Sequence, residues 1–166
     1  MDTEGSCRTS EIRRRAIEGL KAGDSFTVRR TFGEKDVHAF AGVTRDYNPV
    51  HLEGRFASTK GFSGCVCHGL LVGSMLTEIG GQIGWLASGM SFRFLRPVYV
   101  GDTVTCTLTL LEASPEGKAR ATAEFSNQCG ETVLAADLYG ILPREPERGV
   151  LRTMVSEGDP TNPLAR

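Results

Sequence analysis

The sequence has almost no excess charge and no run of basic residues. Its 19 lysines and arginines nearly balance its 20 aspartates and glutamates, which leaves a formal net charge of −1. Nucleic acids and anionic membrane surfaces attract proteins through clustered positive charge. The chain also lacks zinc-finger spacing and the aromatic strand motif of RNA-binding modules. We therefore expect no nucleic-acid partner.

A charge-free hydrophobic run long enough to span a membrane is also missing. The most apolar segment, residues 69–90, contains Glu78 near its middle and several glycines and polar residues. A carboxylate at that position would be costly inside a bilayer. The first ten residues include Asp2 and Glu4 and lack the apolar stretch of a secretory signal. The sequence therefore predicts a cytoplasmic protein without membrane insertion.

The sequence lacks the dense, even set of cysteines that a disulfide framework needs. Its five cysteines are Cys7, Cys65, Cys67, Cys106 and Cys129. Without a signal peptide, this count favours reduced thiols over a disulfide framework. No second pair of ligands accompanies Cys65 and Cys67 at zinc-site spacing, so we expect no metal. A nucleophilic role for Cys67 is disfavoured, although its place before a predicted helix could lower the pKa of its thiol.

The length of 166 residues fits one domain with two extensions. Residues 1–21 form an N-terminal extension, in which Ser10 can start a short helix over 11–21. Residues 22–142 carry the regular hydrophobic patterns of the domain. Residues 143–166 are rich in proline and charge and lack periodicity, so we expect an extended or disordered tail.

The residue pattern predicts one strand, a set of helices and then four strands. A strand is expected over 25–31 and helices over 34–44 and around 53–59. Between these helices, Pro49 keeps Asn48 out of the helical region, which predicts an ordered turn over 45–51. The later strands, with short turns that imply antiparallel pairing, are expected at 91–94, 103–110, 119–126 and 133–142.

Residues 69–84 predict one long helix that is apolar on nearly all sides and therefore buried. Four of its glycines weaken the helix by about 1 kcal/mol each relative to alanine, which suggests that a backbone or a ligand approaches them closely; they are Gly73, Gly80, Gly81 and Gly84. The pattern thus predicts an α+β fold, a curved antiparallel sheet around a long buried central helix. Glu78 could lie at a subunit interface, pair with Arg93 or point into a cavity.

The turn between residues 45 and 51 holds the first candidate catalytic group. Asp46 and His51 are five residues apart, with Asn48 and Pro49 between them. A carboxylate and an imidazole together can hold a water, accept its proton and return a proton elsewhere. Taken alone, these residues fit an ordinary capped turn at least as well.

His68 and Gly69 stand at the start of the long apolar helix. A helix start presents free backbone N–H groups with partial positive charge. Gly69 has no side chain to keep a substrate oxygen away from those donors, as an oxyanion hole requires. An ordinary helix start would have the same local sequence.

Three segments together resemble the MaoC-like hydratases of the hot-dog fold, specifically the R-specific enoyl-CoA hydratases. The first runs from Asp46 to His51, the second from Cys67 to Leu71, and the third from Phe92 to Asp102. The resemblance covers about residues 22–142. It implies that Asp46 and His51 are the catalytic pair, that Gly69 N–H polarises the thioester carbonyl, and that Asn48, Pro49 and His68 shape the loops.

The resemblance also implies the substrate and the assembly. Water would add to trans-2-enoyl-CoA and give (R)-3-hydroxyacyl-CoA, reversibly, with no cofactor beyond the CoA of the substrate and no metal. Family members are usually homodimers with active sites at the subunit interface. Leu76, Thr77 and Gly80 would lie along the acyl chain, and Arg93 or Arg96 could meet coenzyme phosphates. The segment 81–89 is a few residues shorter than in bacterial R-hydratases.

Other functions of the same fold stay open. The chain could dehydrate a 3-hydroxyacyl group on acyl carrier protein, or hydrate a branched or dicarboxylic enoyl-CoA. A hot-dog thioesterase would leave the Asp46–His51 pair unexplained. A non-catalytic acyl-CoA-binding protein is a further alternative, which the intact catalytic motif disfavours.

Overall fold

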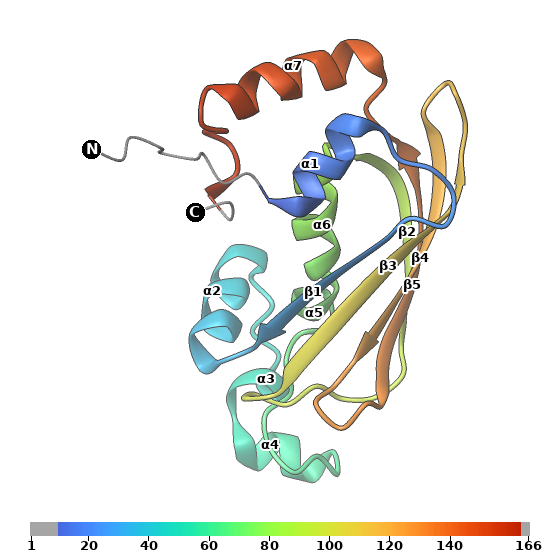
Figure 1. Ribbon diagram of the computed structural model, residues 1–166. Helices are drawn as coiled ribbons and strands as arrows, with labels where there is room; N and C mark the ends of the chain where they lie inside the picture. Colours follow the sequence, from blue (N-terminus) through green and yellow to red (C-terminus); the bar gives the residue numbers. More distant parts are fainter. Residues whose placement is uncertain (1–9, 164–166) are drawn as a thin grey trace.

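A five-stranded antiparallel sheet curves around two consecutive helices (Figure 1). The computed structural model describes residues 10–163. The strand order is β1-β3-β4-β5-β2, so β1 and β2 are the two edges. The elements in chain order are α1 (Glu11–Glu18), β1 (Ser25–Thr31), α2 (Glu34–Thr44), α3 (Pro49–Leu52), α4 (Gly54–Thr59), α5 (Gly69–Gly73), α6 (Met75–Ile83), β2 (Leu86–Phe94), β3 (Thr103–Ala113), β4 (Lys118–Ser126), β5 (Thr132–Ile141) and α7 (Glu145–Ser156).

The strands follow the predicted alternation, with one apolar face against the helices. In β3, Val104, Cys106 and Leu108 are fully buried. The intervening threonines point to the other face, where Thr107 pairs with Thr27 of β1. Strand β2 begins at Leu86 rather than at residue 91, because it pairs with β5 as far as Leu86↔Ile141 across an irregularity at Ala87/Gly89. The α+β fold expected from the sequence is confirmed.

The prediction of one unbroken central helix is wrong, because the helix is interrupted at Ser74. The Ser74 hydroxyl donates to the Leu71 carbonyl at 2.6 Å, and its N–H is shared between the carbonyls of Leu70 and Leu71. A serine that bonds back to the preceding turn distorts a helix. The burial prediction holds for most of α5 and α6, whereas Leu70 is 57% exposed.

Close packing explains only some of the helix glycines. A Cβ atom on Gly73 would lie 2.9 Å from the ring of Phe92. Gly84 ends α6 in the left-handed region, with φ of 79°, as glycine readily does. For Gly80 and Gly81, by contrast, a Cβ would meet no atom of the described residues within 4 Å. No neighbouring segment of the described residues therefore explains these two glycines, and the approach of a ligand or of another chain to them stays a prediction.

The turn after α2 contains a short helix that the sequence analysis missed. Pro49 is its first residue, a position where proline needs no N–H partner and already has helical φ. The Asn48 side chain caps it by accepting from the Val50 N–H at 3.2 Å. Pro49, from which the sequence predicts a turn, is therefore the first residue of helix α3.

The expectation of an extended or disordered tail is wrong for residues 145–156, which form α7. The Glu147 carboxylate accepts from the Arg144 N–H at 2.7 Å and caps this helix. Beyond α7, Asp159 forms a buried ion pair with Arg13 of α1, with 3.6 Å between Nε and Oδ2. The predicted N-terminal helix is observed, with Ser10 as its cap. Residues 1–9 and 164–166 lie outside the described residues.

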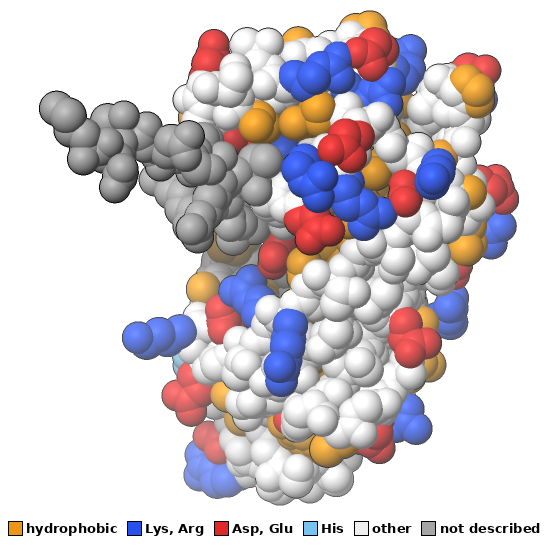
Figure 2. All heavy atoms as spheres, viewed as in Figure 1, with side chains coloured by type: hydrophobic (Ala, Val, Ile, Leu, Met, Phe, Trp, Pro, Cys, Tyr) orange, Lys and Arg blue, Asp and Glu red, His pale blue; other side chains and the backbone are white. Residues whose placement is uncertain are grey.

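No helix among residues 10–163 is long and apolar enough to cross a membrane. Charged side chains of both signs are interspersed over the face shown in Figure 2. Of the alternatives for Glu78, the pair with Arg93 is not observed among the described residues, where Arg93 binds Asp137 at 2.9 Å. Glu78 instead lines a surface cavity between α1, β1 and α6, beside Arg15.

Candidate active site

The end of α2 holds Asp46 in a fixed orientation. Arg45 ends this helix with φ of 60°, in the left-handed region, and turns the chain sharply. The Thr44 hydroxyl then accepts from the Asp46 N–H at 3.3 Å. One carboxylate oxygen, Oδ1, accepts from the Asn48 N–H at 3.2 Å. The other oxygen, Oδ2, is left to face His51.

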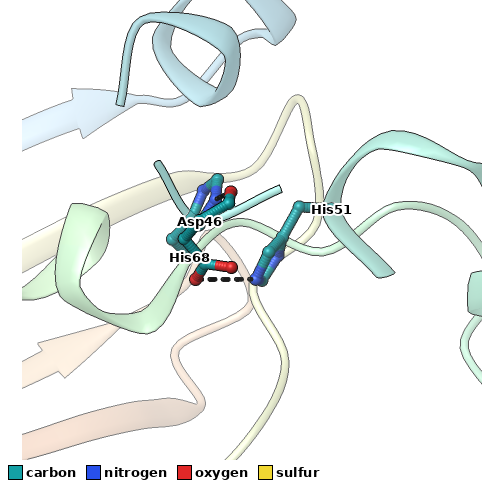
Figure 3. Close-up of side chains that lie close together, drawn as sticks. All are labelled: Asp46, His51 and His68. Atoms are coloured by element: carbon teal, nitrogen blue, oxygen red, sulfur yellow. Dashed lines mark hydrogen bonds and ion pairs between the residues drawn. The ribbon is translucent and has the colours of Figure 1, made fainter. Parts of the chain in front are cut away.

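His51 lies on α3 with its protonation pattern set by one hydrogen bond. Its Nδ1 is 2.7 Å from the carbonyl oxygen of Val66. A carbonyl only accepts, so Nδ1 carries the hydrogen, and in the neutral ring Nε2 presents a lone pair. This Nε2 lies 3.8 Å from Asp46 Oδ2 (Figure 3). That separation is too long for a direct hydrogen bond and leaves two acceptors facing each other.

His68 packs behind this pair and is itself buried, at 2% exposure. Its Nε2 is 3.0 Å from the backbone carbonyl of Asp46, so Nε2 donates. Its ring stacks on His51, with 3.8 Å between ring centroids, and meets the ring of Phe40 on another side. Its Nδ1 is buried and has no hydrogen-bond partner among the described residues. The third histidine, His38, is exposed on α2.

Gly69 begins α5 directly after His68, and no side chain caps this helix start. The first N–H groups of a helix have no partner within the helix, so they can bind a ligand oxygen. A Cβ atom on Gly69 would lie only 2.4 Å from the ring of Phe94. Glycine is therefore required here by the packing of Phe94 as well as by access to the N–H.

A cavity of about 560 Å³ brings most of these groups together. Its wall includes Asp46, His68, Gly69, Phe94 and Arg96. His51 is not part of the wall, but its Nε2 lies 3.8 Å from Oδ2 of Asp46, which is part of it. The predicted catalytic residues Asp46, His51 and Gly69 are thus near one another.

The residues expected along the acyl chain lie elsewhere. Leu76 is in the core, at 1% exposure. The Thr77 hydroxyl donates to the Ser74 carbonyl at 2.6 Å, and Gly80 borders open space. None of the three lines this cavity. Their part in substrate binding stays a prediction.

The site fits a metal ion poorly. Asp46, His51 and His68 each offer one potential ligand atom, and these atoms lie within 4.8 Å of one another. An ion bound by imidazole lies near the plane of that ring, because the nitrogen lone pair does. The rings of His51 and His68 are stacked at an interplanar angle of 28°, so their lone pairs do not converge on one point.

Cys67, just before the helix, is not an activated nucleophile. Burial, with smaller contributions from Asp102 and Asp36, raises the pKa of the Cys67 thiol to about 12. The thiol therefore stays protonated at neutral pH and is not activated. Among residues 10–163, neither Cys65 nor Cys67 belongs to a group of three metal-ligating side chains.

Comparison with known proteins identifies the family. A family model described as "MaoC like domain" matches residues 18–128. The chain belongs to the MaoC-like domain family. It is 36% identical to the (R)-specific enoyl-CoA hydratase of Aeromonas caviae, over 77% of this chain and 99% of that protein. It is 34% identical to a mitochondrial 3-hydroxyacyl-[acyl-carrier-protein] dehydratase of Arabidopsis thaliana, over 75% of this chain and 78% of that protein.

Solved structures give the same family relationship. The unliganded R-hydratase of Pseudomonas aeruginosa superimposes with a TM-score of 0.72 at 30% identity, covering 78% of this chain and 86% of that one. The MaoC-like, hot-dog assignment expected from the sequence is thereby confirmed. Two features of the site escaped sequence analysis: the stacked histidines and the Phe94 ring over Gly69. Both depend on contacts between distant segments. Of the two arginines expected to meet coenzyme phosphates, Arg96 lies in the cavity wall and Arg93 does not.

Proposed function

We propose that the protein is an R-specific enoyl-CoA hydratase, which adds water to trans-2-enoyl-CoA and gives (R)-3-hydroxyacyl-CoA, reversibly. One observation carries the proposal: the Nε2 lone pair of His51 and the carboxylate of Asp46 face each other across 3.8 Å. Two acceptors at this separation suit a water that donates one hydrogen to each. The names of the bacterial relatives support the same reaction and its stereochemistry.

The chemistry follows from the position of that water. The water oxygen bonds to C3 of the enoyl group as the catalytic pair removes one of its protons. The C2=C3 double bond becomes an enolate whose negative charge lies largely on the thioester oxygen. The proton held by Asp46 and His51 is then delivered to C2, which completes the 3-hydroxyacyl product. Dehydration runs through the same steps in reverse.

Gly69 supplies the group that stabilises the enolate. Its N–H, at the start of α5 and on the cavity wall, is placed to donate to the thioester oxygen. A donor fixed before the reaction stabilises developing charge without reorganisation, which typically contributes about 2.7–4 kcal/mol to catalysis.

The carrier of the acyl group is the main alternative. The Arabidopsis relative is named as acting on acyl carrier protein, so the same site could dehydrate 3-hydroxyacyl groups on that carrier. Branched or dicarboxylic enoyl-CoA substrates are a further alternative. CoA is preferred here because the match covers 91% and 99% of the two bacterial relatives named enoyl-CoA hydratases, and 78% of the Arabidopsis relative.

We further propose a homodimer and a reaction without metal or cofactor, in the cytoplasm. Edge strand β2 leaves apolar side chains exposed, with Leu86 at 74% and Phe94 at 58%. Exposed apolar edges favour pairing with another chain. Because Phe94 also lines the cavity, such an interface would extend to the active site. Light scattering at micromolar concentration tests the dimer, and full activity after treatment with EDTA tests the absence of a metal.

Hydration of crotonyl-CoA, followed by the loss of enoyl-thioester absorbance, tests the reaction. We expect absorbance to fall and chiral chromatography to find the R product. The same assay with a panel of enoyl-CoA and enoyl-carrier-protein thioesters identifies the carrier. Tight binding of acyl-CoA with no turnover of any member would contradict the proposal and favour a binding protein.

A further inference from the structure

Arg96 is the one lysine or arginine in the wall of the active-site cavity, as far as residues 10–163 show. Its side chain is 52% exposed, so it stands at the rim rather than in the interior. Most of the surrounding wall is apolar, and the one carboxylate in it is Asp46. The cavity thus has a catalytic acid–base site and a rim cation in the same wall.

The backbone and side chain of Arg96 are both held in place. Its N–H donates to the Val133 carbonyl at 3.1 Å, and the residue that follows is Pro97. Its Nη1 donates to the Thr132 carbonyl at 2.7 Å. These bonds fix the guanidinium and leave Nη2 without a described partner.

Glu131 neutralises Arg96 only weakly. The separation is 3.8 Å from Arg96 Nε to Glu131 Oε1, and both side chains are about half exposed. The other carboxylate oxygen of Glu131 already accepts from Asn127 at 2.9 Å. An exposed ion pair at this distance contributes little, so an anion with more charge can replace it.

Arg93, three residues earlier, shows the contrast. It has similar exposure, 56%, but is paired with Asp137 at 2.9 Å and does not line the cavity. The two arginines of one sequence motif therefore differ: Arg93 is paired closely with Asp137 on the sheet, whereas Arg96 lines the cavity and has only a distant carboxylate partner.

We propose that Arg96 binds the phosphate at the end of the pantetheine arm of the substrate. This inference rests on the proposed function, because it takes a thioester of that arm as the substrate. A guanidinium fork matches phosphate geometry. Since Arg96 is half exposed, it marks the end where the arm leaves the protein. The buried part of the wall, which includes Val66 and Val72, suits the apolar acyl group.

The phosphate has two possible sources, because CoA and acyl carrier protein share the phosphopantetheine arm. Steady-state kinetics with crotonyl thioesters of CoA, phosphopantetheine and pantetheine separate the phosphate from the rest of the carrier. The test variant is Arg96→Met, which keeps a long unbranched side chain and removes the charge. Arg93→Met is the matched control. Comparing crotonyl-CoA with crotonyl carrier protein for the unmodified enzyme identifies the source.

We expect Arg96→Met to raise KM about tenfold or more for the CoA and phosphopantetheine thioesters, since it removes charged hydrogen bonds, with kcat little changed. Its KM for crotonyl-pantetheine should match that of the unmodified enzyme, and Arg93→Met should change none of them. An equal rise with all three thioesters, a rise with CoA alone, or no rise would overturn the proposal.

A failure of the proposed function would be visible separately, as no turnover of any thioester by the unmodified enzyme. Calorimetric titration with phosphopantetheine and with pantetheine then tests Arg96 without catalysis. The unmodified protein should bind phosphopantetheine more tightly than pantetheine, and Arg96→Met should remove that difference. Equal affinity of the unmodified protein for both would overturn the proposal.

Discussion

The Nε2 of His68 donates to the backbone carbonyl of Asp46 at 3.0 Å. The same ring stacks on His51, with 3.8 Å between centroids. One buried side chain therefore touches both members of the proposed catalytic pair, Asp46 and His51, although it belongs to a different loop. His68 lies just before the helix start that supplies the Gly69 N–H, so it also links the pair to the oxyanion donor.

Replacing His68 by phenylalanine tests this link. Phenylalanine keeps a flat ring beside His51 and removes the donor to Asp46. Because small displacements of catalytic groups are costly, we expect kcat for crotonyl-CoA hydration to fall about tenfold to a hundredfold, with KM little changed. His38→Phe, at an exposed position on α2, is the control. Unchanged kcat in His68→Phe would show that the bond does not position Asp46.

Replacing Gly69 by alanine tests the oxyanion donor. The new Cβ would lie 2.4 Å from the Phe94 ring, so the ring or the helix start must shift. We expect hydration to fall at least tenfold, because the donor moves relative to the thioester oxygen. The double variant with Phe94→Leu should recover part of the loss. Full activity in Gly69→Ala would argue against the assigned role of this N–H.

Replacing Arg45 by glycine should stabilise the protein. Arg45 has φ of 60°, a conformation that costs a residue with a side chain about 1 kcal/mol relative to glycine. Thermal unfolding should show a higher Tm for Arg45→Gly. Arg29→Gly, an exposed position within β1, should lower it and serves as the control. A lower Tm for Arg45→Gly would mean that the arginine side chain makes stabilising contacts.

Replacing Asp159 by alanine should destabilise the protein strongly. Asp159 and Arg13 are 1% and 5% exposed at their side chains, so the variant leaves a buried guanidinium without its partner. Losing one partner of such a pair typically costs about 3–5 kcal/mol. Urea unfolding of Asp159→Ala, with Glu157→Ala at an exposed position as control, measures the change. Equal stability of the two variants would show that the C-terminal segment is not anchored by this pair.

Much of the fold could be predicted because it depends on local patterns. The period-two alternation of β3 and β4 specified strands, and the structure places the two residues of the Asp46–His51 motif 3.8 Å apart. The break at Ser74 was missed because a serine hydroxyl can bond either to its own helix or outward. Helix α7 was missed because its apolar side chains are few and its anchor, Arg13–Asp159, joins residues far apart in the sequence.

The same reason limits prediction of the site. The motif placed Asp46, His51 and Gly69 together through resemblance, whereas the tautomers of His51 and His68 depend on the carbonyls of Val66 and Asp46. Those contacts are between separate loops and have no local signature. Likewise, nothing in the motif distinguishes Arg93 from Arg96.

The central claim is that Asp46 and His51 share the water that adds to C3. The most direct test is crotonyl-CoA hydration by Asp46→Asn and His51→Gln, which preserve size and much of the hydrogen bonding. We expect kcat to fall about a hundredfold to ten-thousandfold in each, with circular dichroism and Tm close to those of the unmodified protein. The double variant should be little worse than either single variant, because the two residues act as one unit. Retained hydration in either correctly folded variant would contradict the account.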